Sequence, residues 1–551
     1  MSIHQTADHI LSCLRVYADQ VLEHGRDTSG RTPLFYDGVN AQQYTPVEWV
    51  NADGEVWQPS NLASQQNLFR FLAGLSSITD TPCYINAAKA SIAWHFEHAD
   101  ASGLLYWGGH TFYDLATLTV VGPENKSQVH ELKHHCPFYE LMFEVSPNAT
   151  QRLITATWNA HVSDWQTLAM SRHGEYGKNY DANEIWDKPE PPELTPLREM
   201  KGLSFVNIGN DLIYGAALLG VRDGFSKSGE KSMAWAKLLM QQYINARHPE
   251  TDLGCYQYNR PEKRGEPPVD ESHPEFTFSF WGDRAQRQFG PEHGEAAQEA
   301  WVLFKLDEAA LNGPEGIYGD CALAQTQMAR ALGEQGQWFL ERVGEGLEAW
   351  LQYAYDPVAN EIKPMFADGK DLTGERVKRN GYYGKKGQVF TRRPLPVNVF
   401  LATAVQWQAR KTEALWQALA SMAKHFDLGD WQVSGGVAKT THADDALILL
   451  AVLAVYEGTK DPEYLQLAER VAKNVLARSF SNGWLLPSCR HRYCRFDDPE
   501  ALALLRFVAA VKEQDVPRYV SRGGYIHGDY RLASGEVKNT LDLHQIYTQL
   551  N

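Results

Sequence analysis

Three short segments of this chain carry residue types that hold metal ions in proteins. They read WGGH at 107–110, VHELKHH at 129–135 and MSRHGEYGK at 170–178. Glycines stand beside His110 and His173, which leaves the backbone there open to a large molecule. Two imidazoles and one carboxylate, with coordination positions left open, suit Mn, Fe, Co, Ni or Zn. Taken singly, each histidine is more often a packed or surface residue, because the chain has 19 of them.

The second segment also spells the zinc-protease motif HExxH, from His130 to His134. That motif lies on a helix, where two histidines one turn apart face the same metal. Here Pro137 follows Cys136, and the residue before a proline is disfavoured in helical conformation. The preceding GPENKSQ at 122–128 predicts a turn. The segment HELKHH is therefore predicted to be a short strand or a loop, and we reject the protease interpretation.

Two basic segments could contact an acidic ligand. In FWGDRAQRQFG (280–290), Arg284 and Arg287 lie three residues apart, so on a helix they would face one way and bind carboxylates. A salt-bridged surface turn with Asp283 explains the same residues equally well. GYYGKKGQVFTRR (381–393) is either a loop that lines a cleft or a solvated surface loop.

Three tryptophans are candidates for stacking on sugar rings: Trp107, Trp158 and Trp165. Trp158 and Trp165 lie in a segment with helical periodicity, however. Core packing is therefore the better interpretation for at least one of them.

The elements that would position these residues are mainly helical. Apolar residues recur at the i, i+3, i+4 and i+7 spacing of amphipathic helices in the segments 67–78, 85–99, 149–165, 211–225, 231–247, 296–310, 336–355, 444–458 and 462–478. They follow one another in pairs joined by loops rich in Gly, Pro and Asp, which indicates an α/α toroid or solenoid. A closed toroid would hold residues 1–551 as a single domain.

Short strands interrupt the helices. The segment GLLYWGGHTFYDLATLTVVG (103–122) is rich in β-branched residues and partly alternating, and HELKHHC is expected to pair with it. GCYQYN (254–259) and FTFSFWG (276–282) could add further strands. The chain has no GxGxxG or Walker motif, so nucleotide-binding folds are poor candidates.

Composition and charge exclude several classes of function. Apolar residues make up 43% of the chain and charged residues 22%, as in an ordinary globular protein. The net charge of −16 disfavours binding to nucleic acid or to an anionic membrane surface. The sequence MSIHQTADHILSCLRVYADQ at the start predicts an amphipathic helix rather than a signal peptide. The scattered cysteines, 7 in number, suit reduced thiols, so a cytoplasmic location is expected.

The metal-ligand segments, taken together, resemble a known family. The runs YWGGH (106–110), HELKHHCPFYELMFEVSPNATQRLITATWNAHVSDW (130–165) and SRHGEYGK (171–178) are similar to polysaccharide lyase family 2, a family of pectate lyases. The resemblance extends over most of the chain and implies a mainly α fold, an (α/α)7 barrel with short β arms flanking a cleft. It also implies cleavage of polygalacturonate by metal-assisted β-elimination, with manganese, or else nickel or cobalt, as the cofactor. Members without a signal peptide are expected to be exolytic and to release disaccharides.

The resemblance also assigns residues. Matched by order and motif, the metal ligands become His110, Glu131 and His173, and the catalytic residue becomes Arg172. Glu140 in FYELMFE is the rival carboxylate, and its apolar surroundings favour an outer-shell or structural role. The residues expected to contact substrate are Arg284, Arg287, Lys133, Trp165 and Tyr176.

The chemistry of β-elimination explains why these residue types are needed. The reaction removes the C5 proton of a uronate and expels the O4 oxygen, while a dication neutralises the neighbouring carboxylate. Arg172 can accept the proton only where nearby cations or desolvation disfavour its charged form, because the guanidinium pKa is above about 12. If Arg172 instead clamps the substrate carboxylate, the base is expected among Lys133, Lys178 and Tyr176.

Two alternatives belong to other functional classes. A metal-independent glycoside hydrolase on an α/α toroid, acting on uronides, would need two carboxylates flanking the scissile bond, and Asp444 with Asp445 is a pair of that kind. A non-catalytic oligogalacturonate-binding protein would keep its metal affinity and show no turnover.

Overall fold

The computed structural model of the chain describes residues 2–122, 129–132, 134–178, 185–191, 209–222, 227–254, 315–378, 384–521 and 526–550. The chain divides into two compact units. The first comprises Met1–Thr157, His173–Ala182 and Val437–Asn551, and the second comprises Trp158–Arg172 and Asn183–Gly436. The prediction that residues 1–551 close into one toroidal domain stays a prediction.

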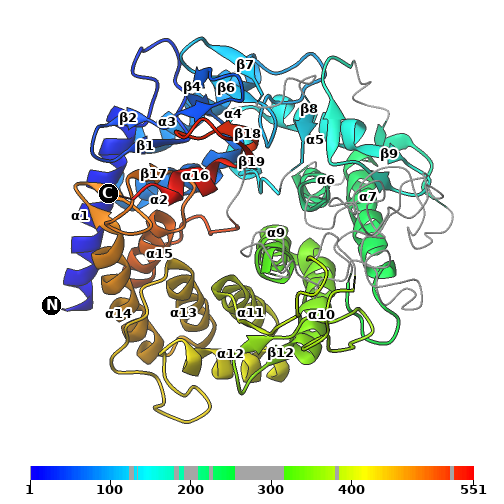
Figure 1. Ribbon diagram of the computed structural model, residues 1–551, viewed down its shortest axis with the longest axis vertical. Coiled ribbons are helices and arrows are strands. Elements are labelled where there is room, and N and C mark those ends of the chain that lie inside the picture. The colour runs from blue at the N-terminus through cyan, green and yellow to red at the C-terminus, as the bar shows by residue number, and fades with distance from the viewer. Residues whose placement is uncertain are drawn as a thin grey trace. The chain divides into compact units, whose positions relative to one another are not determined.

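The first unit is built on helices that pack side by side (Figure 1). Helix α1 (Ile3–His24) begins with a capping box between Ser2 and Gln5 and packs against α15 (Glu500–Lys512) and α14 (Pro462–Ser479). Helix α13 (Ala446–Thr459) contacts both α14 and α15. Its apolar residues surround the helix, as expected for one that is covered on every side.

Further helices belong to this unit in whole or in part. Helix α2 (Gln66–Thr79) packs against α3 (Cys83–Glu97) and α15, and α3 contacts α4 (Tyr139–Val145). Helix α16 (Asp542–Thr548) lies near the end of the chain. Helix α5 (Pro147–His161) crosses from the first unit into the second.

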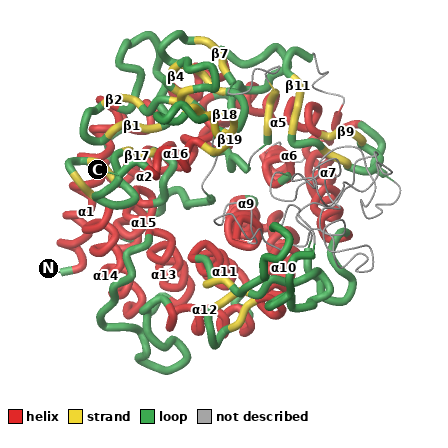
Figure 2. Tube along the Cα trace, viewed as in Figure 1, coloured by secondary structure: helices red, strands yellow, loops and turns green. Residues whose placement is uncertain are grey.

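The strands of the first unit are short antiparallel pieces (Figure 2). They form the groups β1 (Gly38–Asn40) with β2 (Thr45–Pro46) and β17 (Tyr493–Arg495); β3 (Trp49–Val50) with β4 (Val56–Trp57); β5 (Pro59–Ser60) with β6 (Phe112–Asp114) and β7 (Thr119–Val121); β8 (Val129–Glu131) with β11 (His173–Glu175); β15 (Phe480–Ser481) with β16 (Trp484–Leu485); and β18 (His527–Arg531) with β19 (Val537–Leu541).

The second unit repeats the helix-pair theme. Helix α6 (Asn210–Arg222) packs against α7 (Lys227–Asn245) and α9 (Ala322–Ala331), and α9 packs against α10 (Gln337–Ala354) and α11 (Val397–Arg410). Helix α12 (Glu413–His425) covers α11. The described strands of this unit are β9 (Val162–Asp164) with β10 (Ala169–Met170), and β12 (Tyr355–Asp356) with β13 (Glu361–Ile362) and β14 (Arg393–Pro394).

This architecture confirms the predicted fold class, mainly helical with short strands. The helix predicted over 149–165 ends earlier, at His161, because Val162–Asp164 pairs with β10 instead. The predicted pairing of HELKHHC with 103–122 is wrong: β7 pairs with β6, and β8 takes β11 as its partner. The predicted helix 296–310, the predicted strand 276–282 and all of 254–259 except Gly254 lie outside the described residues. None of the helices in the described ranges is long and apolar enough to cross a membrane.

Candidate metal centre

The loop that carries His110 contains a backbone conformation that favours glycine. Gly108 has a φ of 109°, in the left-handed region that residues with a Cβ rarely adopt. A Cβ on Gly108 would stand 2.8 Å from the carbonyl oxygen of Glu131. The turn can therefore lie directly against the strand that carries the carboxylate.

The register of β8 and β11 brings the other two candidate ligands together. The strands are antiparallel, with His173 opposite Glu131 and Gly174 opposite His130. Residues opposite each other in a ladder place their side chains on the same face. Gly174 and His130 lie on the opposite face of the two strands. Because Gly174 has no side chain, it does not crowd that of His130.

The three side chains converge on one point. His110 Nε2 lies 3.1 Å from Glu131 Oε2, and His173 Nε2 lies 3.4 Å from Glu131 Oε1. One ligand atom from each residue can be chosen so that all lie within 4.8 Å of one another. The carboxylate side chain is fully buried, whereas the His173 side chain is 38% exposed. The group is thus closed on the carboxylate side and accessible beside His173.

A backbone contact orients the His110 ring. Its Nδ1 lies 3.1 Å from the carbonyl oxygen of His527, and a carbonyl can only accept a hydrogen bond, so Nδ1 carries the proton. Nε2 is then the lone-pair nitrogen, and it faces Glu131. This is how proteins commonly prepare a histidine for a metal, by fixing its tautomer from outside. The sequence analysis missed His527, and a main-chain acceptor leaves no residue-type pattern that could have revealed it.

The donor set fits a transition metal. Two neutral imidazole nitrogens and one carboxylate suit Mn, Co, Ni or Zn, whereas Ca²⁺ prefers a shell made of oxygens. A buried carboxylate is costly without a positive partner, and a dication among these three side chains would supply one.

The described residues of the HExxH motif lie on a strand and a loop rather than on a helix, so its two histidines do not share one helical face. His130 faces away from Glu131 on β8, and its Nε2 accepts a 2.8 Å hydrogen bond from Trp107 Nε1. His134 has a φ of 61°, which is incompatible with a right-handed helix. The prediction of a strand or loop is confirmed. Glu140 lies in the first turn of α4 and is not part of the group of metal-ligand types found among the described residues.

Tyr176 and Lys178 follow β11. The Tyr176 hydroxyl donates a 2.9 Å hydrogen bond to the carbonyl oxygen of Leu105, and its ring packs against Tyr106 at 4.8 Å. Burial raises the pKa of Tyr176 well above its usual value. Lys178 Nζ forms a 2.6 Å ion pair with Glu175. Both side chains therefore already have protein partners.

Arg172 directly precedes His173 in the chain, so consecutive Cα atoms about 3.8 Å apart tie it to the metal group. The preceding residue is held on both sides: Ser171 N donates to the His161 carbonyl at 2.8 Å, and His161 Nδ1 donates to the Ser171 carbonyl at 2.7 Å. The end of β10 thus fixes the backbone from which Arg172 extends.

The predictions for Trp158 and Trp165 have different outcomes. Trp158 is fully buried and donates its indole N–H to the Leu212 carbonyl at 2.9 Å, which confirms core packing for that residue. Trp165 is partly exposed and packs between Trp158 and Trp235, with Lys188 Nζ 5.2 Å from its ring centre. Its proposed contact with substrate stays a prediction. Lys133, Arg284 and Arg287 lie outside the described residues.

One carboxylate of the pair considered for a hydrolase, Asp445, has a structural role. The Asp445 side chain accepts a 2.7 Å hydrogen bond from Leu447 N and caps the start of α13. Asp444 beside it is exposed. An N-cap carboxylate is engaged by backbone donors, which leaves this pair poorly suited to general acid–base work.

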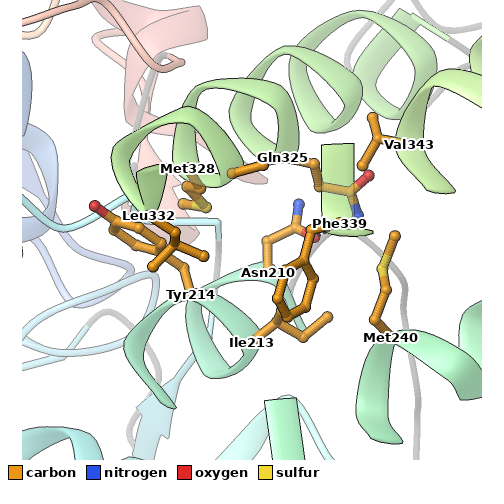
Figure 3. Close-up of a pocket in the computed structure, with 10 residues that line it drawn as sticks. Asn210, Ile213, Tyr214, Met240, Gln325, Met328, Leu332, Phe339 and Val343 are labelled. Carbon is orange, nitrogen blue, oxygen red and sulfur yellow. Dashed lines mark hydrogen bonds between the residues drawn. The ribbon is translucent and has the colours of Figure 1, made fainter. Parts of the chain in front are cut away.

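A small pocket lies among the helices of the second unit (Figure 3). Asn210, Ile213 and Tyr214 of α6 face Gln325 and other residues of α9 across it, and the pocket volume is about 20 Å³. Gln325 Nε2 donates to Asn210 Oδ1 at 2.7 Å, so the two amide side chains of the pocket are hydrogen-bonded to each other. A space of that size holds about one water molecule and cannot admit a sugar ring.

Comparison with known proteins decides the family. Residues 32–529 match the model of the family described as "Periplasmic pectate lyase". The chain is also 36% identical to a pectate disaccharide-lyase from Dickeya dadantii (strain 3937), over 98% of this chain and 96% of that protein. The chain belongs to this pectate lyase family. The resemblance found in the sequence is confirmed, and the protein is a polysaccharide lyase.

The fold of this chain is only distantly similar to the following solved structures. A sugar epimerase from a ruminal bacterium covers 93% of the lyase chain and is itself covered completely, with 10% identity and a TM-score of 0.43. An unsaturated glucuronyl hydrolase specific for heparin gives 10% identity and a TM-score of 0.39, with 93% of this chain and 100% of that chain covered. These values carry no inference about the reaction.

Proposed function

We propose that this polysaccharide lyase cleaves galacturonate oligomers by metal-assisted β-elimination and releases unsaturated digalacturonate from a chain end. The similarity to a pectate disaccharide-lyase over almost the full length of both chains supports the substrate and the product. The observation that carries the mechanism is the convergence of His110, Glu131 and His173 on one point.

In this proposal His110, Glu131 and His173 hold a divalent transition metal, with manganese the first choice and nickel or cobalt the alternatives. When bound, the ion neutralises the substrate carboxylate and stabilises the negative charge that develops as the C5 proton leaves. Glu131 supplies the anionic ligand from a buried position. The exposed edge of His173 faces the side from which a uronate can enter.

Arg172 takes the C5 proton in the proposed reaction. The C5–H electron pair then forms the C4=C5 double bond, the C4–O4 bond breaks, and the departing O4 receives a proton from water. The other candidates that the structure describes are less suited: Tyr176 is partly buried with a raised pKa, and Lys178 is paired with Glu175. Lys133, Arg284 and Arg287 remain the proposed contacts for the further carboxylates of the oligomer.

The test of the reaction class is ultraviolet absorbance of the unsaturated product, with polygalacturonate as substrate. We expect absorbance to rise with added Mn²⁺ and to stop after chelation, and product sizing to show the unsaturated dimer from the first turnovers. Glu131→Ala should lose both bound metal and turnover. Cleavage without absorbance would indicate hydrolysis, and a ladder of longer products would contradict the exolytic mode.

A second test separates the two roles of Arg172. If it is the base, Arg172→Lys should keep some activity with an optimum at lower pH, because lysine loses its proton more readily than arginine. Arg172→Ala should lose nearly all kcat. A clamp predicts that the loss falls on KM with the pH profile unmoved. Lys89→Ala is the control, since it removes a cation that is paired with Glu144 and is not a candidate base, and it should change neither quantity.

We also propose that the enzyme works in the cytoplasm, although its family is described as periplasmic. The cysteines that the structure describes form no disulfide, which suits a reducing compartment. Cell fractionation tests this directly. Lyase activity that is released with a periplasmic marker by osmotic shock would overturn the cytoplasmic assignment and leave the reaction unaffected.

A further inference from the structure

We propose that Asn61 is a positioning residue: it holds the metal loop, Gly108–His110, in the shape that presents His110 to the metal. The inference rests on the proposed function, because it takes His110, Glu131 and His173 as the metal ligands. It concerns a residue that touches neither the ion nor the substrate and acts through the backbone of the loop.

The Asn61 side chain binds both polar groups of one residue. Its Oδ1 accepts a 3.0 Å hydrogen bond from Gly108 N, and its Nδ2 donates a 2.9 Å hydrogen bond to the Gly108 carbonyl. The side chain therefore does for Gly108 what a neighbouring strand does for a strand residue. Asn61 is fully buried, so its removal would leave buried backbone groups of the loop unpaired, at a real cost.

Gly108 is the residue that most needs such a constraint. Glycine has the widest conformational freedom of any residue, and its φ of 109° lies where few other residues go. It stands two residues before His110 and packs against the Glu131 carbonyl and the His135 ring. A change in its torsions would move His110 relative to Glu131.

Asn61 is itself held rigidly. Its backbone N–H donates to Asp37 Oδ1 at 2.8 Å, and its Oδ1 also accepts from Ala63 N at 3.2 Å as the cap of the short helix η1 (Leu62–Gln65). The same Asp37 oxygen accepts from Ser64 Oγ at 3.0 Å. Asn61 thus connects the metal loop to the start of α2 through hydrogen bonds between buried atoms.

The far end of the loop is held by main-chain atoms. His527 N donates to the Gly109 carbonyl at 2.8 Å, and the His527 carbonyl accepts from His110 Nδ1. A substitution cannot delete these groups. Asn61 is therefore the side chain through which the preorganisation of the loop can be tested.

The experiment is Mn²⁺ binding to chelated, metal-free protein, followed by calorimetry or by the electron paramagnetic resonance of free Mn²⁺. We expect Asn61→Ala to raise the Kd about 10- to 100-fold, the range seen when outer-shell partners of metal ligands are removed. The matched control is Asn51→Ala. Asn51 is also a buried asparagine, and within the described part of the chain its side chain binds the turn at Asp53–Glu55, so its loss should leave Kd unchanged.

A double-mutant cycle with Gly108→Ala tests the route of the effect. If Asn61 acts through Gly108, the loss of affinity in the double variant should be less than the sum of the two single losses in free energy. Additive losses would overturn the proposed route. A normal Kd in Asn61→Ala, with a site that Glu131→Ala abolishes, would refute the positioning role and leave the proposed function standing. Wild-type protein that binds no Mn²⁺, Ni²⁺ or Co²⁺ would refute both.

Discussion

Asp37 is the buried carboxyl group that accepts a hydrogen bond from the backbone of Asn61. Replacing it with asparagine isolates one electrostatic contribution to folding. The side chain is 1% exposed. Its Oδ1 accepts from Asn61 N and Ser64 Oγ, whereas its Oδ2 has no hydrogen-bond partner within the described ranges. Desolvation raises the pKa of Asp37 from 3.8 to about 7, against the opposing effect of the Arg495 charge.

The sign of the pH effect follows from that shift. Between pH about 4 and pH about 7 the folded protein keeps a proton on Asp37 that the unfolded chain has released. The contribution of this raised pKa to the free energy of unfolding is therefore complete below the unfolded pKa and is lost as the pH rises through the folded pKa. One pKa unit corresponds to about 1.4 kcal/mol, so a shift of about three units amounts to about 4 kcal/mol.

Asp37→Asn keeps an oxygen for Asn61 and Ser64 and removes the titration. Urea unfolding of chelated protein, followed by tryptophan fluorescence at pH 5 and pH 8, measures the effect. The free energy of unfolding of the variant minus that of wild type should rise by about 3 kcal/mol between the two pH values, because about a third of the total effect is already lost at pH 5. Ser64→Ala, which removes a hydrogen bond to the same oxygen but keeps the carboxyl group, should follow the wild-type slope. Parallel profiles for Asp37→Asn and wild type would refute a raised pKa at Asp37.

Three further substitutions test assignments around the metal group. His134→Ala should keep bound Mn²⁺, because the loop conformation of His134 places it outside the coordinating set, and metal analysis checks this. Glu140→Ala should likewise keep metal, and a loss there with normal content in Glu131→Ala would move the carboxylate ligand to α4. Tyr176→Phe should keep kcat in the lyase assay and lose about 1 kcal/mol of unfolding free energy in urea, since it removes one hydrogen bond to Leu105; a collapse of kcat would give Tyr176 the base role.

The helices and the ligand types could be predicted from the sequence for a simple physical reason. A helix of about four or more turns repeats its apolar face several times, so its period stands out, as in α2 and α14. His110, Glu131 and His173 carry their chemistry in their side chains. Residue type therefore marked the segments that carry them, and the resemblance to a known family selected the three residues.

The assembly of the site was harder to predict. A strand of three residues, such as β8, gives too short a run for period two to choose its partner, and β11 was not foreseen as that partner. Asn61 belongs to no motif, because its role depends on the torsion of Gly108, far along the chain. His527 contributes backbone atoms, which every residue type possesses. Long-range strand pairing and main-chain contacts therefore cannot be predicted from residue types.

The HELKH segment shows how the backbone determines what a set of letters can do. On a helix, residues four apart share a face, so both histidines of HExxH would turn toward one metal. On β8 neighbouring residues point to opposite faces, so His130 turns to Trp107 while Glu131 turns to His110 and His173. Its second histidine has already left the strand. The carboxylate that would activate water in a protease is therefore the proposed metal ligand of this lyase, and its proposed histidine partners come from other segments of the chain.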